Sequence, residues 1–95
     1  MKEKYVIAIK SRKDFNGKDC EEWRYVGRGG SGIPFWALSD LGILIFPTVE
    51  VAEEWFLSNK RYLFEEYTKK YEFDMSTLSI MKIKIDYVVA KTLEI

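Results

Sequence analysis

The chain has 95 residues, 47% hydrophobic and 32% charged, and its fifteen Lys and Arg residues balance fifteen Asp and Glu residues. This length and composition exclude a disordered chain and predict one globular domain over residues 1–95. Zero net charge argues against a general polyanion binder and against an acidic mimic of nucleic acid. The charge is uneven, because basic residues outnumber acidic ones over 1–34 and acidic residues predominate over 40–76.

A few residue types constrain the compartment and the chemistry. The apolar run at 5–9 is too short for a signal peptide, and no stretch approaches the ~20 apolar residues of a membrane span. Cys20 is the sole cysteine of the sequence and fits a reduced thiol in a reducing compartment. The sequence has no histidine, the usual general base and the commonest zinc ligand. We therefore expect a cytoplasmic, non-catalytic protein with no metal, no cofactor and no membrane partner.

The first part of the chain predicts a β-hairpin. Residues 5–9 are apolar on both faces and predict a buried central strand, and residues 22–26 alternate as the returning strand. Asn16-Gly17 is the best two-residue turn signal between them. A tight turn there sorts the side chains into two faces, with Val6, Ala8, Trp23 and Tyr25 on one and Ile7, Ile9, Arg24 and Val26 on the other. A bulge or a longer loop reverses this pairing of faces, and the sequence leaves both open.

A glycine-rich loop at 27–32, closed by Pro34, follows the hairpin. Its glycines fit the G-x-G-x-x-G spacing of dinucleotide loops, but no helix starts after them, so we interpret the segment as a loop between strands. Residues 35–38 predict a strand or one helical turn, and residues 42–46 predict a short strand that leads into a helix.

The longest helical signal runs from Phe46 to Tyr71, with Thr48 as the expected N-cap. Its apolar stripe consists of Val49, Ala52, Trp55, Phe56, Asn59, Tyr62, Leu63 and Tyr67. With Leu57, Phe64 and Tyr71 beside it, the stripe is too wide for a helix that lies on one sheet. Either the helix breaks near 58–60, which the weak helix formers there favour, or it runs straight and buries a second side against a loop or a partner chain.

Residues 46–53 resemble the pattern F-x-[ST]-x-E-x-A-E, a strand-to-helix junction common in small phage- and prophage-encoded accessory proteins of low-GC bacteria. The resemblance covers these residues alone and supplies no functional residue. It implies a phage-encoded inhibitor of a host enzyme or defence system, such as an anti-CRISPR-like protein.

The last part of the chain predicts a polar connection at 74–77 and then one strand over 81–89, which we expect to lie beside the first strand. Lys82 and Lys84 fall on the solvent side of that strand. The predicted fold class is α+β, with a small antiparallel sheet of three to five strands and one long or broken helix packed on one face, in the order β-β-β-α-β.

Binding to another protein is the function that the composition favours. Aromatic residues make up 16% of the chain, more than one small core readily buries, and interfaces are enriched in aromatic residues and Arg. Arg28 within the glycine-rich loop and Trp36 just after it predict an anchor pair for a partner such as a host enzyme or defence complex, and a homodimer is an alternative. The predicted binding residues are Lys13, Lys18, Arg24, Arg28, Gly29, Gly30 and Trp36.

Single-stranded nucleic acid is the second predicted partner class. The hairpin interleaves basic residues with Phe15, Trp23 and Tyr25, which is a pattern suited to phosphate pairing and base stacking. Acidic residues in the same hairpin weaken its positive field. A small enzyme is the third interpretation. It ranks last because, without histidine, its chemistry would rest on Tyr, Lys, Arg or carboxylates alone. We interpret the helix glutamates as a solvated face.

Overall fold

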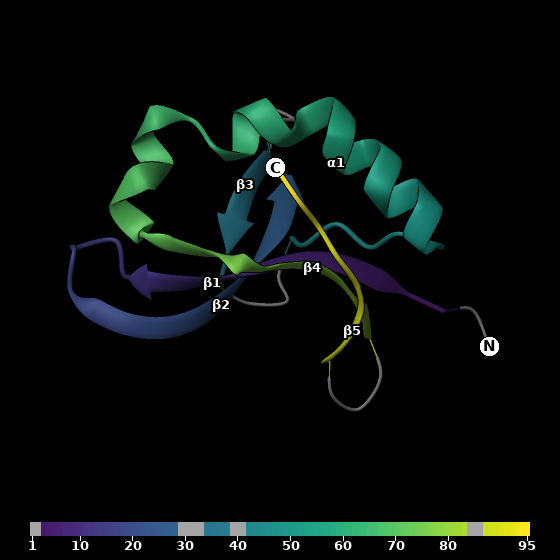
Figure 1. Ribbon diagram of the computed structural model, residues 1–95, viewed down its shortest axis with the longest axis horizontal. Coiled ribbons are helices and arrows are strands. Elements are labelled where there is room, and N and C mark those ends of the chain that lie inside the picture. The colour runs from purple at the N-terminus through teal and green to yellow at the C-terminus, as the bar shows by residue number, and fades with distance from the viewer. Residues whose placement is uncertain (1–2, 29–33, 39–41, 84–86) are drawn as a thin grey trace.

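A computed structural model describes residues 3–28, 34–38, 42–83 and 87–95, without the side chains of residues 67, 87 and 88. Five antiparallel strands form one sheet in the order β3-β2-β1-β4-β5, and helix α1 and the 3-10 helix η1 lie on one face of it (Figure 1). The elements are β1 Tyr5–Lys13, β2 Asp19–Arg28, β3 Pro34–Ala37, α1 Val49–Leu63, η1 Glu66–Tyr71, β4 Phe73–Ile83 and β5 Tyr87–Thr92. The predicted α+β class is confirmed. The C-terminal part of the chain also returns to the sheet beside β1, as predicted, because β4 pairs with β1.

The C-terminal part differs from its prediction, because it forms two strands rather than one. The predicted polar connection at 74–77 lies inside β4, where the pairing of β4 with β1 shifts register between Ala8 and Lys10. Thr77 Oγ1 accepts a hydrogen bond from Lys10 N at 2.8 Å, so a polar side chain satisfies the irregular step. Lys82 is half-buried at the surface, where it forms an ion pair with Glu3. Lys84 lies outside the described residues.

Two irregularities set the register of the β1–β2 hairpin. Its turn has three residues, with Asp14 N bonded to Lys18 O at 2.9 Å, and Gly17 adopts φ 79°, so the predicted two-residue turn is wrong. That turn offsets the pairing by one residue, and a bulge between Ser11 and Lys13 restores it. Ala8 therefore pairs with Tyr25, and the two faces are those that a tight turn would have given.

The main core lies between the sheet and α1. It unites apolar side chains from every layer, namely Tyr5, Ile7, Ile9, Val26, Trp36, Phe46, Ala52, Phe56, Leu63, Leu78, Ile80 and Leu93. A smaller cluster of Val6, Ala8 and Met81 lies on the opposite face, with Trp23 and Tyr25 packed against it. β1 is apolar on both sides because it is the central strand and contributes to both clusters.

Helix α1 does not break at 58–60 and instead runs to Leu63, so the favoured break point is wrong. The Asn59 side chain donates to Trp55 O at 2.8 Å, and this bond accommodates a weak helix former inside the helix. The chain turns at Phe64 and continues as η1 from Glu66. Leu57 stays 58% exposed on the straight helix.

Residues 42–46 connect the strands to α1 without forming the predicted continuous strand. Leu44 N donates to Val26 O at 2.9 Å, whereas Phe46 and Tyr5 exchange two backbone bonds of 2.8 and 2.9 Å. The segment thus divides its bonds between β2 and β1, and its only ladder contacts among the described residues are isolated bridges at Ile43 and Phe46. No described helix is long and apolar enough to cross a membrane.

Thr48 caps α1 as predicted, because its side chain accepts from Val51 N at 3.1 Å. Thr48→Ala is expected to lower the free energy of unfolding by about 1 kcal/mol, since it leaves that N–H without its side-chain acceptor. Urea denaturation measures the change. Thr48→Ser keeps an acceptor oxygen and should unfold at nearly the wild-type urea concentration; an Ala variant as stable as the wild type would show that the cap contributes nothing.

Candidate functional site

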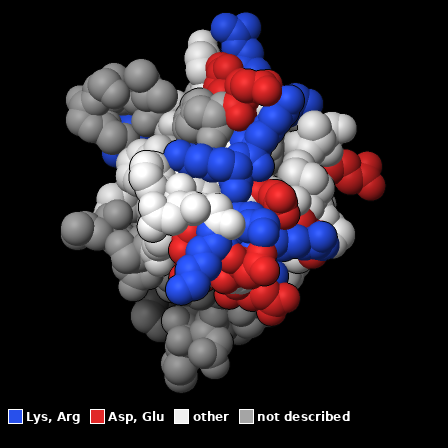
Figure 2. Space-filling model, turned by 90° about the vertical axis from the view of Figure 1, so that its left-hand side faces the viewer, with Lys and Arg blue, Asp and Glu red and all other residues white. Residues whose placement is uncertain are grey.

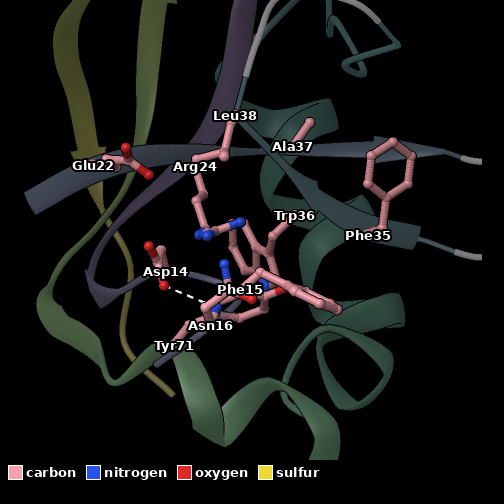
Figure 3. Close-up of a pocket in the computed structure, with 10 residues that line it drawn as sticks. All are labelled: Asp14, Phe15, Asn16, Glu22, Arg24, Phe35, Trp36, Ala37, Leu38 and Tyr71. Carbon is pink, nitrogen blue, oxygen red and sulfur yellow. Dashed lines mark hydrogen bonds between the residues drawn. The ribbon is translucent and has the colours of Figure 1, made fainter. Parts of the chain in front are cut away.

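A pocket of about 570 Å³ opens where the tip of the β1–β2 hairpin, β2, β3 and η1 meet (Figure 3). We call it the Arg24 pocket, because the guanidinium of Arg24 points into it. Its volume falls within the ~300–1,000 Å³ range of ligand-binding clefts. The lining residues are Asp14, Phe15, Asn16, Glu22, Arg24, Phe35, Trp36, Ala37, Leu38 and Tyr71.

Arg24 is a charged residue on the core-facing side of β2, where it pairs with Ile9 and is only 3% exposed. Its Nε donates to Ser11 Oγ at 3.0 Å, and its guanidinium carbon lies 3.9 Å from the centroid of the Tyr71 ring. Its terminal nitrogen Nη2 is buried without a hydrogen-bond partner in the described structure. The ion pairs found among the described residues do not include Arg24. A buried guanidinium is thus held in place while one of its donors remains unused.

The support beneath Arg24 comes from β1. Ser11 is fully buried, and its hydroxyl donates to Glu22 O at 3.2 Å while it accepts from Arg24. This chain of bonds fixes the position of Nε, and the Tyr71 ring fixes the plane of the guanidinium. The remaining donor nitrogen is therefore pre-oriented, which lowers the entropy cost of meeting an acceptor.

Trp36 forms a rigid wall of the pocket rather than a free anchor. It is 7% exposed, and its Nε1 donates to Leu63 O at 2.8 Å, a carbonyl in the last turn of α1. The rings of Phe64 and Phe73 lie with centroids 5.7 and 5.3 Å from that of Trp36. Such packing immobilises the indole, so Trp36 shapes the pocket and its removal would also cost stability.

Exposed apolar side chains form the rim. Phe15 at the hairpin tip is 70% exposed, and Leu38 after β3 is 54% exposed. Phe35 on β3 is also exposed, and the ammonium of Lys70 lies 4.0 Å from the centroid of the Phe15 ring. Apolar groups around a recess with a buried donor are typical of surfaces that become covered on binding.

Two carboxylates also line the pocket, but neither one forms an ion pair with Arg24. Asp14 Oδ1 accepts from Asn16 N at 2.8 Å and from Lys18 N at 2.9 Å, so this carboxylate stabilises its own turn. Glu22 is exposed and lies at the edge of the pocket (Figure 3). The pocket therefore has a cationic interior, and its margin carries two carboxylates together with Lys70 beside Phe15.

The structure brings together two of the residues that the sequence predicts for binding, Arg24 and Trp36. Arg28 is exposed at the end of β2, about 13 Å from Arg24 at ~3.3 Å per residue, and does not line the pocket. The predicted Arg28–Trp36 anchor pair is thus split between an exposed strand end and the core. Gly29 and Gly30 lie outside the described residues.

The other two predicted residues, Lys13 and Lys18, lie in the hairpin beside the pocket. Lys13 forms an ion pair with Asp19, and the hydrogen bond between them raises the pKa of Lys13 and lowers that of Asp19. Lys18 is exposed next to the turn. Neither lysine lines the pocket, so both contribute charge near it and not a wall of it.

Sequence reasoning misses Ser11, Leu38 and Tyr71 as site residues. One signal does exist in the sequence, because the alternation of β2 places Arg24 on the same face as Ile7 and Ile9. An arginine at a core-facing strand position needs partners, and this requirement marks it for attention. The identity of those partners depends on η1 and β3, which approach β2 only in the folded chain.

The basic and aromatic residues of the hairpin do not form one surface. Lys10 pairs with Glu21 at 3.8 Å and Arg12 pairs with Asp74 at 3.3 Å. Figure 2 shows cationic and acidic side chains intermixed on the end of the molecule that faces left in Figure 1. Trp23 packs on the sheet face opposite to Arg24. This arrangement offers no continuous track for a phosphate backbone on the described surface.

The fold and the pocket define a small antiparallel α+β domain with a ligand-sized recess at one end of its sheet. No family model, no curated protein and no solved structure matches this chain. The described residues also contain no group of three or more Cys, Asp or Glu side chains that could hold a metal ion.

Proposed function

We propose that this chain is a non-catalytic protein-binding module that contacts its partner through the Arg24 pocket and the apolar rim. The observation that carries the proposal is Arg24, whose guanidinium lines an open recess while its Nη2 is buried without a hydrogen-bond partner in the described structure. A buried donor without an acceptor costs about 1–3 kcal/mol. A partner that supplies the acceptor and covers Phe15 and Leu38 recovers this energy and buries apolar surface at the same time.

The resemblance of residues 46–53 to junctions in phage-encoded accessory proteins extends this proposal. It favours a host enzyme or defence complex as the partner and inhibition as the outcome. This step stays a prediction, since the resemblance contains none of the residues of the pocket.

Single-stranded nucleic acid remains the second candidate because Lys10 Nζ lies 6.0 Å from the centroid of the half-buried Trp23 ring. That pair could stack a base beside a phosphate. The ion pairs of Lys10 and Arg12 reduce the available charge. If this function holds, oligonucleotide affinity falls steeply with salt; absence of a gel shift at low salt eliminates it.

Selection of a displayed peptide library on the full chain tests the protein-binding function. The enriched peptides are measured against Leu38→Ser and against Leu57→Ser, a matched control because the two leucines are 54% and 58% exposed on different surfaces. We expect Leu38→Ser to weaken binding by about tenfold, equivalent to losing roughly 1.4 kcal/mol of contact, and Leu57→Ser to leave it unchanged.

Arg28→Glu separates this site from the one that the sequence predicts. Arg28 lies outside the pocket, so we expect the variant to bind the selected peptides as the wild type does. Loss of binding in Arg28→Glu with retention in Leu38→Ser would move the site to the far end of β2 and overturn the proposal.

A further inference from the structure

We propose that the Arg24 pocket recognises a carboxylate side chain, an Asp or Glu that sits next to an apolar residue in a segment of the partner protein. This inference rests on the proposed function and names the chemistry that the same site selects. It starts from three features of the site: the unpartnered buried Nη2 of Arg24, the apolar walls of the pocket and the two carboxylates at its mouth.

The state of Arg24 favours a charged acceptor over a neutral one. The residue is only 3% exposed, yet its observed partners are a neutral hydroxyl and an aromatic ring. A carboxylate that enters the pocket beside the guanidinium forms a charge-assisted bond and neutralises the buried charge, whereas a neutral carbonyl oxygen supplies only an acceptor. The geometry is suited to this role because Ser11 and Tyr71 hold the guanidinium without occupying Nη2.

The margin of the pocket favours a singly charged ligand over a phosphate. Asp14 and Glu22 line the mouth. They repel a phosphate group, which carries a charge near −2 at neutral pH, more strongly than they repel one carboxylate. The two carboxylates also oppose the continuous charge of a nucleic acid, and Lys70 beside Phe15 offsets only part of this repulsion.

The backbone around the pocket favours a side-chain carboxylate over a C-terminal carboxylate as the ligand. Capture of a C-terminal carboxylate typically uses several free backbone N–H groups. At the hairpin tip these groups are already used, since Asn16 N and Lys18 N bond to Asp14 Oδ1 and Gly17 N bonds to Asp14 O. One arginine nitrogen suits a single side-chain carboxylate, and Phe15 and Leu38 can cover the apolar residue beside it.

A pair of small probes tests the carboxylate preference without knowledge of the partner. 3-Phenylpropionate combines a carboxylate with a ring, and 3-phenylpropanamide replaces the carboxylate with a neutral amide of similar shape. Titration is followed by NMR through the Nε–H signals of Arg24 and Trp36. We expect both signals to shift, with the acid binding about tenfold tighter than the amide. Equal affinities, no binding by the acid or tighter binding by inorganic phosphate overturn the inference.

Leu38→Asp and Leu57→Asp provide a matched pair of folded variants. A carboxylate at position 38 lies on the rim and should weaken 3-phenylpropionate binding several-fold by repulsion, whereas one at 57 should have no effect. Equal binding to both variants would place the probe elsewhere. These exposed positions test the site even if substitution of Arg24 itself prevents folding.

The selected peptides separate the two proposals. Each peptide is made in three forms: its acidic residue intact, that residue changed to the amide, and the amide form with a free C-terminal carboxylate. Binding only by the first form supports a side-chain acid. Peptides that bind more weakly to Leu38→Ser than to the wild type, but bind equally in all three forms, overturn the carboxylate inference and leave the protein-binding function standing. If 3-phenylpropionate binds but selection yields no peptide that needs Leu38, the protein-binding function fails instead.

Discussion

Phe56→Ala is expected to lower the free energy of unfolding by about 3–5 kcal/mol, a large fraction of the roughly 5–15 kcal/mol that stabilises a domain of this size. Phe56 is 1% exposed at the centre of the main core, and its ring lies 6.4 Å from that of Phe64 in an edge-on arrangement. Truncation leaves a cavity between α1 and the sheet that neither rigid layer can close. Urea denaturation followed by tryptophan fluorescence measures the loss.

Leu57→Ala provides the matched control, because it removes an apolar side chain from the next residue of the same helix. Leu57 is 58% exposed, so we expect a change within about 0.5 kcal/mol. Similar losses in the two variants would mean that the helix is rotated from the position described here, or that Leu57 is covered by another chain in solution.

Gly27→Ala is expected to destabilise the protein by about 1–3 kcal/mol, even though glycine is ordinarily the poorer strand residue. A Cβ at position 27 would lie 2.8 Å from Gly42 O and 2.9 Å from Cζ of Phe35. The carbonyl belongs to the backbone of the segment that hydrogen-bonds to β2, so it cannot rotate away. The added methyl group must therefore push apart β2 and residues 42–46. Thermal unfolding measures the effect.

Gly17→Asn is the corresponding control in the hairpin turn. Gly17 also has a special conformation, φ 79°, but nothing lies within 4 Å of a Cβ placed there. Asn tolerates positive φ better than other residues, so we expect a loss of about 1 kcal/mol or less. If Gly27→Ala were the milder change, the close approach of residues 42–46 to β2 would be wrong.

Much of the fold could be predicted because it depends on local pattern. The apolar run at 5–9 marks the central strand, and Thr48 marks the helix start. The end of α1 could not be predicted, because the carbonyl of Leu63 accepts from the indole of Trp36, a contact 27 residues away in sequence. The sequence also predicts one C-terminal strand instead of two, because the alternation of apolar and polar residues gives no sign of where β4 ends and β5 begins.

Part of the candidate site can be predicted from the sequence. Arg24 falls on the core-facing side of its strand in the register that a tight turn gives, and that register holds because the longer turn and the bulge cancel. The pocket itself was not predictable, since Tyr71 and Leu38 come from η1 and from the end of β3. The sequence predicts Trp36 as an interface residue, yet the fold uses it to join α1 to the sheet.

The central claim is that Arg24 serves binding rather than folding, and the unfolding free energy of Arg24→Met tests it most directly. Met fills similar space, and Ser11 keeps its bond to Glu22 O, so the change strands no buried polar group. The variant loses about 0.5–1.5 kcal/mol from the Ser11 bond and about 0.5–2 from the Tyr71 contact, but removes an unpartnered buried charge that costs at least as much. We predict stability equal to or above that of the wild type; a loss of more than about 2 kcal/mol would show that Arg24 is structural and contradict the account.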